Sequence, residues 1–429
     1  MCSALLAIAK DRDRRIRRDI ILERRDSCLA ITASTVDRRW VGQSASHDLV
    51  IVVHAVPRGF DPRAHRAAVP CDIGNCLVTD CRSVLSYFRS YFEPGRRARF
   101  ANHSTGLIAR HLYEILDEFG PVSYFGSKER PEGIDADLFV GHFWSFAELC
   151  ERNRFAVKMA FYSVSDPVET RRRLTEVSNR RGVPLPEWDL PPASFDHHQT
   201  MELADVVFVV GNSYTRTTFP EQWHHKIVML NYSIDSSLFS GSADDSQRSE
   251  FCYVATHCGL RKGFLDVLDV WSQIEPSTSR LHVIGNIDAP YDAMLESANN
   301  GSVEYHGWID SDSAEYHRII NRCRFAHVPT YSEGQMGTLL ELIHSGCVPL
   351  TTAASGIDDE VLAHCVVIEP LDIAGQRSAI AEVLAWSDAE YERRQARLMD
   401  ATRRTQTWPS FHFRVHSAAI GALTTAGVR

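Results

Sequence analysis

The sequence predicts an α/β protein with two domains, each built on a parallel sheet. The chain has 429 residues, which is enough for two domains of ordinary size with separate cores. Its hydrophobic content of 44% and charged content of 24% are typical of globular domains. Residues 325–329 have a buried-strand pattern, a helix is expected from near Met336 to His344, and 347–352 has the pattern of the next strand. This strand–loop–helix–strand order is that of a parallel sheet.

The first half of the chain shows the same alternation, although residues 1–95 contain no motif. Within that part, 47–54 has the pattern of a strand and 81–92 has helical periodicity. Further strands are predicted at 121–125, 137–142, 156–163 and 204–213, with a strand, turn and helix over 99–116. The polar segment 166–192 predicts an exposed helix and loop, either solvated or in contact with an acceptor.

The second half continues with strands expected at 251–256, 281–285 and 303–309, followed by a charged helix over 389–403. An aromatic segment, 408–413, leads to a final helix over 415–423. We therefore divide the chain into 1–95 (an extension or part of the first domain), 96–232, 233–405 and 406–429.

Charge and hydropathy exclude several classes of protein. A formal net charge of −9 argues against a general nucleic-acid binder. No apolar run approaches the roughly 20 residues that cross a bilayer, and the start of the chain lacks the pattern of a secretion signal. A cytoplasmic location is expected. The basic stretch 11–19, continued at 23–25, is interpreted as a solvated helix or tail, or as a peripheral contact with an anionic membrane.

The most informative segment is 331–341, where Glu333 and Glu341 lie eight positions apart around the predicted helix start. Free N–H groups and partial positive charge at such a start suit a diphosphate, leaving the carboxylates for sugar hydroxyls. The two glutamates would lie about 12 Å apart if the interval were helical. Alternatively, Glu333 caps the helix and Glu341 is a solvated helix residue.

This segment resembles the glutamate motif of glycosyltransferase family 4, whose GT-B fold has two Rossmann-like domains facing each other across a cleft. The resemblance covers roughly residues 200 to 370. It implies that Glu333 lies by the transferred sugar and that Glu341 binds the nucleotide ribose. The donor-binding loop and helix start would comprise Gly334, Gln335, Met336, Gly337 and Thr338. The family's second glycine stands one place earlier than Gly337.

The same resemblance assigns the first strand of the second domain and its phosphate-binding loop to 251–263. Lys262, beside Gly263, is the candidate for the donor diphosphate, and Arg261 is a second candidate or a solvated cation. If this backbone is extended, the side chain of Arg261 points away from that of Lys262. The family's upstream arginine is replaced by Thr256 or His257.

Four further residues are candidates for the site. Trp308 and Ile309 stand at the end of the predicted strand 303–309, just after its glycine, and would contact the nucleotide base, as the resemblance implies, or belong to the core. His142 ends another strand, where the resemblance places a histidine near the transferred sugar; His103 is a rival, and either is also compatible with a structural role.

The resemblance implies a retaining glycosyltransferase that uses a nucleotide-diphosphate sugar and an unidentified acceptor, with no metal or other cofactor. The last helix would cross back onto the first domain. Two other classes remain open: a non-catalytic nucleotide-sugar-binding module on this fold, and a nucleotide-sugar epimerase or phosphorylase with the same two-domain layout.

Overall fold

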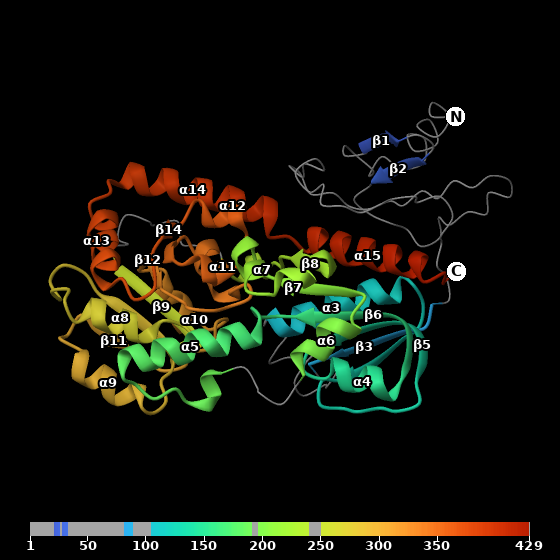
Figure 1. Cartoon of the computed structure of the whole chain (residues 1–429). Helices are drawn as coiled ribbons and strands as arrows, with labels where there is room; N and C mark the ends of the chain where they lie inside the picture. The colour runs from blue at the N-terminus through green and yellow to red at the C-terminus, as the bar shows by residue number, and fades with distance from the viewer. Residues whose placement is uncertain are drawn as a thin grey trace.

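The computed structural model describes residues 21–25, 28–32, 81–88, 104–190, 196–239 and 250–428, with the first two segments described as backbone only. Most of these residues form two lobes, each with a six-stranded parallel sheet (Figure 1). Residues Ile21–Arg25 (β1) and Cys28–Thr32 (β2) form a separate antiparallel pair.

The first sheet has the strand order β4-β3-β5-β6-β7-β8. Its strands are Ser83–Tyr87 (β3), Val122–Gly126 (β4), Asp135–His142 (β5), Arg154–Tyr162 (β6), Val206–Val210 (β7) and Ile227–Leu230 (β8). Alternate residues of β5 enter different cores: Leu138 and Val140 pack on one face, and Phe139 packs on the other. A parallel sheet covered on both faces has this two-sided burial.

Helices cover both faces of this first sheet. Ser104–Asp117 (α3) contributes to the core on one face, while Phe146–Arg152 (α4) and His197–Leu203 (α6) contribute to the core on the other. Short helices Ser213–Thr217 (α7) and Glu221–Lys226 (η4) connect β7 to β8.

The second sheet has the order β11-β10-β9-β12-β13-β14. Its strands are Glu250–His257 (β9), Leu281–Asn286 (β10), Val303–Tyr305 (β11), Cys323–Val328 (β12), Val348–Thr351 (β13) and Val366–Val367 (β14). The helices of this lobe are Phe264–Trp271 (α8), Tyr291–Ala298 (α9), Ala314–Ile320 (α10), Gly337–His344 (α11), Asp359–Leu362 (α12) and Ile373–Leu384 (α13). The predicted two-domain α/β architecture is confirmed.

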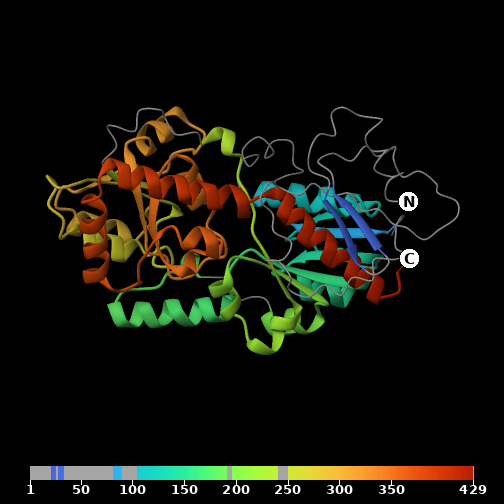
Figure 2. The same cartoon turned by 90° about the horizontal axis from the view of Figure 1, so that it is seen from above.

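The last two helices connect the lobes again. Asp388–Thr405 (α14) lies along the second lobe, and Trp408–Thr425 (α15) continues across the first (Figures 1 and 2). Trp408 stacks on His111 of α3 with ring centroids 3.8 Å apart, and on Tyr232 at 6.1 Å. The last helix therefore lies against the first domain, and the aromatic segment 408–413 forms its first turns.

Two local predictions are wrong. Residues 81–92 were expected to be helical, but Ser83–Tyr87 is a strand between β4 and β5. Every residue of that strand is buried, so it lacks two-residue alternation, and periodicity alone does not separate a short buried strand from a helix. Residues 23–25, where a helix or tail was expected, belong to strand β1, and the basic stretch 11–19 itself lies outside the described residues. The strand predicted at 47–54 lies outside the described residues, as does His103.

None of the helices in the described part of the chain combines the length and the apolar character that a membrane span requires.

Candidate functional site

The candidate site lies where the carboxyl ends of both sheets face each other. In the second domain it is built by the loops that follow β9, β12 and β13, and the loop after β12 leads into α11. In a parallel α/β sheet, this end of the strands is where ligands bind. The loops of the first domain after β6, β7 and β8 are in direct contact with it.

Glu333, in the loop after β12, is the centre of a buried ion group. Its Oε1 atom lies 2.7 Å from Lys262 Nζ and accepts a hydrogen bond of 2.8 Å from Arg261 Nη1. The side chain of Glu333 is only 8% exposed, whereas those of Lys262 and Arg261 are 15% and 28% exposed. The structure therefore brings together three predicted site residues from two separate loops.

Arg261 is also held by Asp189, which sequence reasoning missed. The backbone N–H of Arg261 donates to Asp189 Oδ2 at 3.0 Å, and its Nε lies 3.9 Å from Oδ1. The backbone here turns, with Gly263 at φ 74°, so it is not extended. Consequently the side chains of Arg261 and Lys262 both reach the Glu333 carboxylate. They were expected to point apart only if the backbone were extended, and it is not.

The pKa values of this group follow from burial and pairing. Burial opposes ionisation of Glu333, but the charges of Arg261 and Lys262 outweigh it and hold the pKa of that carboxyl below its usual value. Burial lowers the pKa of Lys262, against the opposing effect of Glu333. Two cations are therefore concentrated at this point and neutralised by the Glu333 and Asp189 carboxylates.

Gly263 allows this loop to approach the loop after β12. A Cβ atom there would lie 2.1 Å from the carbonyl oxygen of Pro329, and Gly263 is the N-cap of α8. Gly133 has nearly the same φ of 72°, but a Cβ atom there would meet nothing within 4 Å. Substitutions at the two glycines therefore distinguish the cost of backbone strain, which both share, from the cost of a steric clash, which only Gly263 has.

We expect Gly263→Ala to destabilise the protein much more than Gly133→Ala. Both substitutions incur the left-handed backbone penalty of about 1–2 kcal/mol. Only Gly263→Ala adds a clash with backbone, taking its loss to or beyond the ~3 kcal/mol that ordinary substitutions reach. Denaturant unfolding of both variants measures the difference, and equal losses would contradict the close packing of the two loops.

The start of α11 is fastened to the first domain by Tyr232, a second residue that sequence reasoning missed. Gln335 Nε2 donates to the carbonyl of Tyr232 at 2.7 Å, and Gln335 Oε1 accepts from its N–H at 3.0 Å. The Tyr232 hydroxyl donates to the carbonyl of Gln335 at 3.0 Å. Thus the Gln335 side chain, a predicted donor contact, is engaged in an interdomain clamp.

The neighbouring residues of the loop are placed as follows. A Cβ atom on Gly334 would lie 2.3 Å from the carbonyl oxygen of Ser163, so this glycine lies against the first domain's backbone. Met336 is buried, while Gly337 and Thr338 begin α11 and are partly exposed. Trp308 is 50% exposed and Ile309 packs partly against the core.

Glu341 lies in the second turn of α11, half-buried, with Oε2 3.4 Å from the Tyr316 hydroxyl. Burial raises the pKa of Glu341 to about 7, with the Tyr316 hydrogen bond opposing the rise. Glu341 therefore changes its charge near neutral pH, unlike Glu333, and it is not a fully solvated helix residue.

Glu341 is expected to make stability fall as pH rises. Its unfolded pKa is about 4.3, and its folded pKa is about 7. Between these values the folded state retains a proton that the unfolded state has released, so raising the pH lowers the free energy of unfolding through this window. Denaturant unfolding of the wild type and Glu341→Gln across this range measures the effect. Parallel pH profiles for the two proteins would contradict the shifted pKa.

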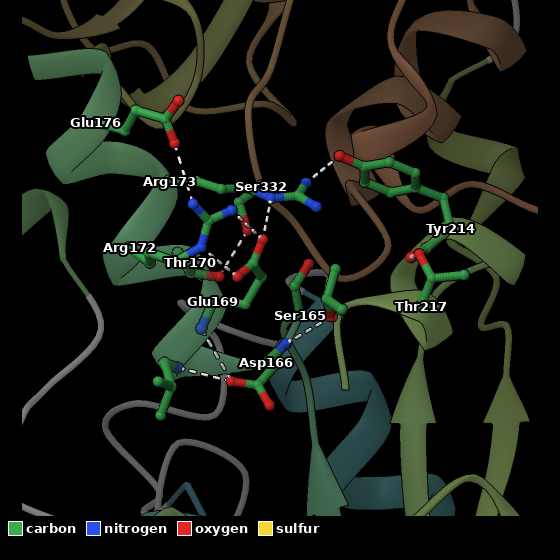
Figure 3. Close-up of polar contacts among 12 residues, drawn as sticks. Ser165, Asp166, Glu169, Thr170, Arg172, Arg173, Glu176, Tyr214, Thr217 and Ser332 are labelled. Atoms are coloured by element: carbon green, nitrogen blue, oxygen red, sulfur yellow. Dashed lines mark hydrogen bonds and ion pairs between the residues drawn. The ribbon is translucent and has the colours of Figure 1, made fainter. Parts of the chain in front are cut away.

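Helix α5, Pro167–Arg181, spans from the first domain to the second (Figure 1). It is capped by Asp166, whose Oδ1 accepts from the N–H groups of Val168 and Glu169 at 2.7 and 3.1 Å. Figure 3 shows this first turn beside the 331–333 loop, with the Thr170 hydroxyl 2.6 Å from that of Ser332. Ser165 Oγ donates to the carbonyl of Glu333 itself.

Two arginines on α5 are paired on this side of the site. Glu169 accepts from Arg172 Nε at 2.7 Å and from Arg173 Nε at 2.8 Å (Figure 3). Arg173 also donates to the Tyr214 hydroxyl of α7. The predicted helix and loop are present over 166–190, the part of the segment that the structure describes, and their contacts include the second domain.

The far end of α5 is attached to Asp266, a fully buried carboxylate of α8. Arg181 pairs with Asp266, whose Oδ1 also accepts from the Tyr331 hydroxyl at 2.6 Å. The N–H of Leu371 donates to Oδ2 at 2.7 Å. Asp266 therefore fixes the position of Tyr331, two residues before Glu333, and nothing in the sequence around Asp266 signals this role.

His142 lies at the end of β5, as predicted, and is fully buried among the rings of Tyr87, Phe88, Phe143 and Trp144. Its Nε2 lies 3.3 Å from Ser163 Oγ, and within the described residues its Nδ1 has no partner. Burial lowers the pKa of His142 to about 3, so the ring is neutral. No hydrogen bond or ion pair among the described residues joins it to Glu333; Ser163, against Gly334, stands between them.

Two groups of histidine and glutamate side chains in the described part of the chain have the spacing of metal ligands: His111, Glu114 and His412, and His282, Glu304 and His306. Neither includes Glu333, Lys262 or Glu341.

Comparison with known proteins gives a family match over part of the chain. Residues 248–385 match the family model described as Glycosyl transferases group 1. No curated protein sequence matches the chain.

Solved structures match over most of the chain. The sucrose-phosphate synthase of Thermosynechococcus elongatus has a TM-score of 0.57 at 15% identity, covering 78% of this chain and 97% of that one. A trehalose-6-phosphate structure from E. coli bound with UDP-2-fluoro glucose has a TM-score of 0.53 at 13% identity, covering 80% of this chain and 99% of that one. Anabaena HepE in complex with UDP and glucose has a TM-score of 0.50 at 12% identity, covering 81% of this chain and 100% of that one. The fold is GT-B, and the segment that matches the group 1 glycosyltransferase model lies in the second domain.

Proposed function

We propose that the protein transfers a sugar from a nucleotide-diphosphate donor to an acceptor hydroxyl, with retention of anomeric configuration and without a metal at the donor site. The observation that carries this proposal is the pairing of Glu333 with Lys262 and Arg261 beside the N-terminus of α11. Two cations and free helix N–H groups at one point suit a diphosphate.

In this proposal each part of the donor is bound by different residues, and the two glutamates bind the ribose and the sugar. Lys262 and Arg261 bind the diphosphate, with the start of α11 near Gly337 as a further source of positive potential. Glu341 accepts hydrogen bonds from the ribose, Trp308 and Ile309 face the base, and Glu333 reaches the sugar.

Binding the donor requires Glu333 to release part of its hold on the cations. The bond between the sugar and the diphosphate then breaks, the acceptor oxygen bonds to the anomeric carbon on the same face, and the proton of the acceptor hydroxyl passes to the departing diphosphate. Negative charge develops on the departing β-phosphate, where Lys262, Arg261 and the helix N-terminus stabilise it. This positive charge performs the task that a divalent metal performs in other sites.

His142 is proposed to contact the transferred sugar. Its buried Nδ1 has no partner among the described residues, and a buried polar atom without a hydrogen bond is unfavourable. A sugar hydroxyl that donates to this nitrogen would satisfy it. The low pKa of His142 favours such an acceptor role, because the ring stays neutral at physiological pH.

A panel of nucleotide sugars tests the proposal. UDP-glucose is the first donor to examine, since two of the similar structures contain UDP with glucose or a fluoro-glucose. A cognate donor at 100 times its dissociation constant should raise the free energy of unfolding by about 2.7 kcal/mol.

The donor that stabilises the protein is then incubated with candidate acceptors, and products are identified by mass spectrometry and by the configuration of the new linkage. Stabilisation by no nucleotide sugar would contradict the proposed donor class. An inverted linkage would contradict retention alone. Binding without transfer or hydrolysis, over a broad acceptor set, would favour the non-catalytic module.

A further inference from the structure

A second group of ligand-type side chains lies on three neighbouring strands of the second sheet, β9, β10 and β11. His282 on β10 is directly opposite Glu304 on β11 in the parallel register. His306 follows β11 two residues after Glu304, and residues two apart on an extended chain share a face. Paired strands therefore hold these three side chains together.

Their spacing is close to that of ligands around one small cation. His282 Nδ1 lies 2.9 Å from His306 Nε2 and 3.6 Å from Glu304 Oε2, and His306 Nε2 lies 3.8 Å from Glu304 Oε1. Tetrahedral zinc with bonds of about 2.0–2.1 Å places its ligand atoms roughly 3.3 Å apart. Shifts of about half an ångström would adapt the three groups to the ion.

The buried histidine also has the support that metal-bound histidines require. His282 Nε2 lies 2.8 Å from Glu250 Oε2, and Glu250 Oε1 accepts from Arg322 Nη2 at 2.8 Å. A carboxylate on the outer nitrogen fixes the tautomer, so that the inner nitrogen, Nδ1, presents its lone pair. His282 is fully buried, whereas the Glu304 side chain is 46% exposed and leaves a route for a cation and a water ligand.

We propose that His282, Glu304 and His306 bind a zinc-type divalent cation, with Glu250 as the positioning residue for His282. Two imidazoles and one carboxylate form a donor set that suits zinc better than magnesium or calcium. The ion replaces the proton shared between the two rings. It fixes the turn after β11, where the Gly307 carbonyl accepts from the N–H of Gly285 at 2.8 Å, just before Trp308.

The other candidate group is less complete. His111 Nδ1 lies 2.7 Å from His412 Nε2 and 3.4 Å from Glu114 Oε2. However, Glu114 Oε1 already accepts from Arg110 at 2.7 Å. Among the described residues, no further carboxylate is recorded on either ring.

The test is a direct titration of the metal-stripped full-length protein with Co²⁺ and then Zn²⁺. We expect one equivalent of Co²⁺ to give the visible absorption of a tetrahedral N/O site, and Zn²⁺ to displace it. Glu304→Ala and His306→Ala should weaken binding at least 100-fold, whereas Glu250→Gln, which keeps all three ligands, should weaken it about 10–100-fold.

Glu315→Ala is the matched control, because it removes a nearby exposed carboxylate whose side chain is 62% exposed. It should bind as the wild type does. Circular dichroism establishes that each variant is folded. Three results would each overturn the proposal. The first is that the wild type binds no tetrahedral cation, and the second is that Glu304→Ala binds as the wild type does. The third is that His412→Ala loses the signal while His306→Ala keeps it. The measurement does not depend on transferase activity.

Discussion

Replacing Lys262 by alanine is expected to weaken binding of a nucleoside diphosphate about 10–100-fold and to leave binding of the matching nucleoside unchanged. A hydrogen bond to a charged group contributes about 1.5–3 kcal/mol, and Lys262 is within 2.7 Å of a carboxylate at the position proposed for the diphosphate. Transfer should fall further, by about 10²–10³-fold, because charge grows on the departing phosphate.

Calorimetric titration with both ligands measures the difference. Lys128→Ala is the control, since it removes the same charge from an exposed position after β4, an edge strand of the first sheet. Arg261 remains paired with Glu333 in Lys262→Ala, so the loop keeps one of its ion pairs. If diphosphate and nucleoside lose affinity equally, Lys262 is not in the phosphate site.

Substitution of Glu333 is expected to separate transfer from nucleotide binding. Glu333→Ala should reduce transfer about 10²–10³-fold, while nucleoside-diphosphate affinity is retained or increased. In the unliganded protein the Glu333 carboxylate is paired with both Arg261 and Lys262. Removing it leaves these two cations available to bind the phosphate. Removing one partner from a buried ion pair costs about 3–5 kcal/mol, so the variant should be less stable until a diphosphate binds.

Thermal unfolding with and without a nucleoside diphosphate measures this rescue, which should exceed that of the wild type. Glu187→Gln serves as the control, since its side chain is 83% exposed. Normal turnover by Glu333→Ala would show that the glutamate motif has been misinterpreted. Wild-type transfer is expected to persist with a chelator; restoration of a lost activity by Mg²⁺ or Mn²⁺ would contradict a metal-free donor site, whereas restoration by Zn²⁺ alone would point to the His282 group.

Sequence patterns predicted the secondary structure correctly where the spacing of buried residues fits only one type of element. The strand, loop and helix around Glu333 were predicted to within a residue or two, because a glycine-bearing turn separates a buried strand from an amphipathic helix there. By contrast, 81–92 was assigned to a helix, because β3 is buried on both faces and its apolar spacing is compatible with either structure. No local signal in that segment separates the two.

The site was predictable as a set of residues but not as a set of contacts. Lys262 and Glu333 were selected separately, yet their ion pair depends on two loops 71 positions apart in the chain. The turn at Gly263 directs Arg261 to the same carboxylate. Asp189 and Tyr232 come from the other side of the interdomain contact, and neither belongs to a motif.

The sequence by itself determined the two-domain α/β class, the strand–loop–helix–strand unit around Glu333 and the glutamate motif, because these depend on local periodicity and on spacing within one loop and helix. Only the tertiary structure decided that Glu333 neutralises two cations, that Gln335 joins the domains, and that the pKa of Glu341 is raised to about 7. These properties arise from burial and from charges brought together by distant segments. Electrostatic energies depend on separation in space, which spacing along the chain does not specify.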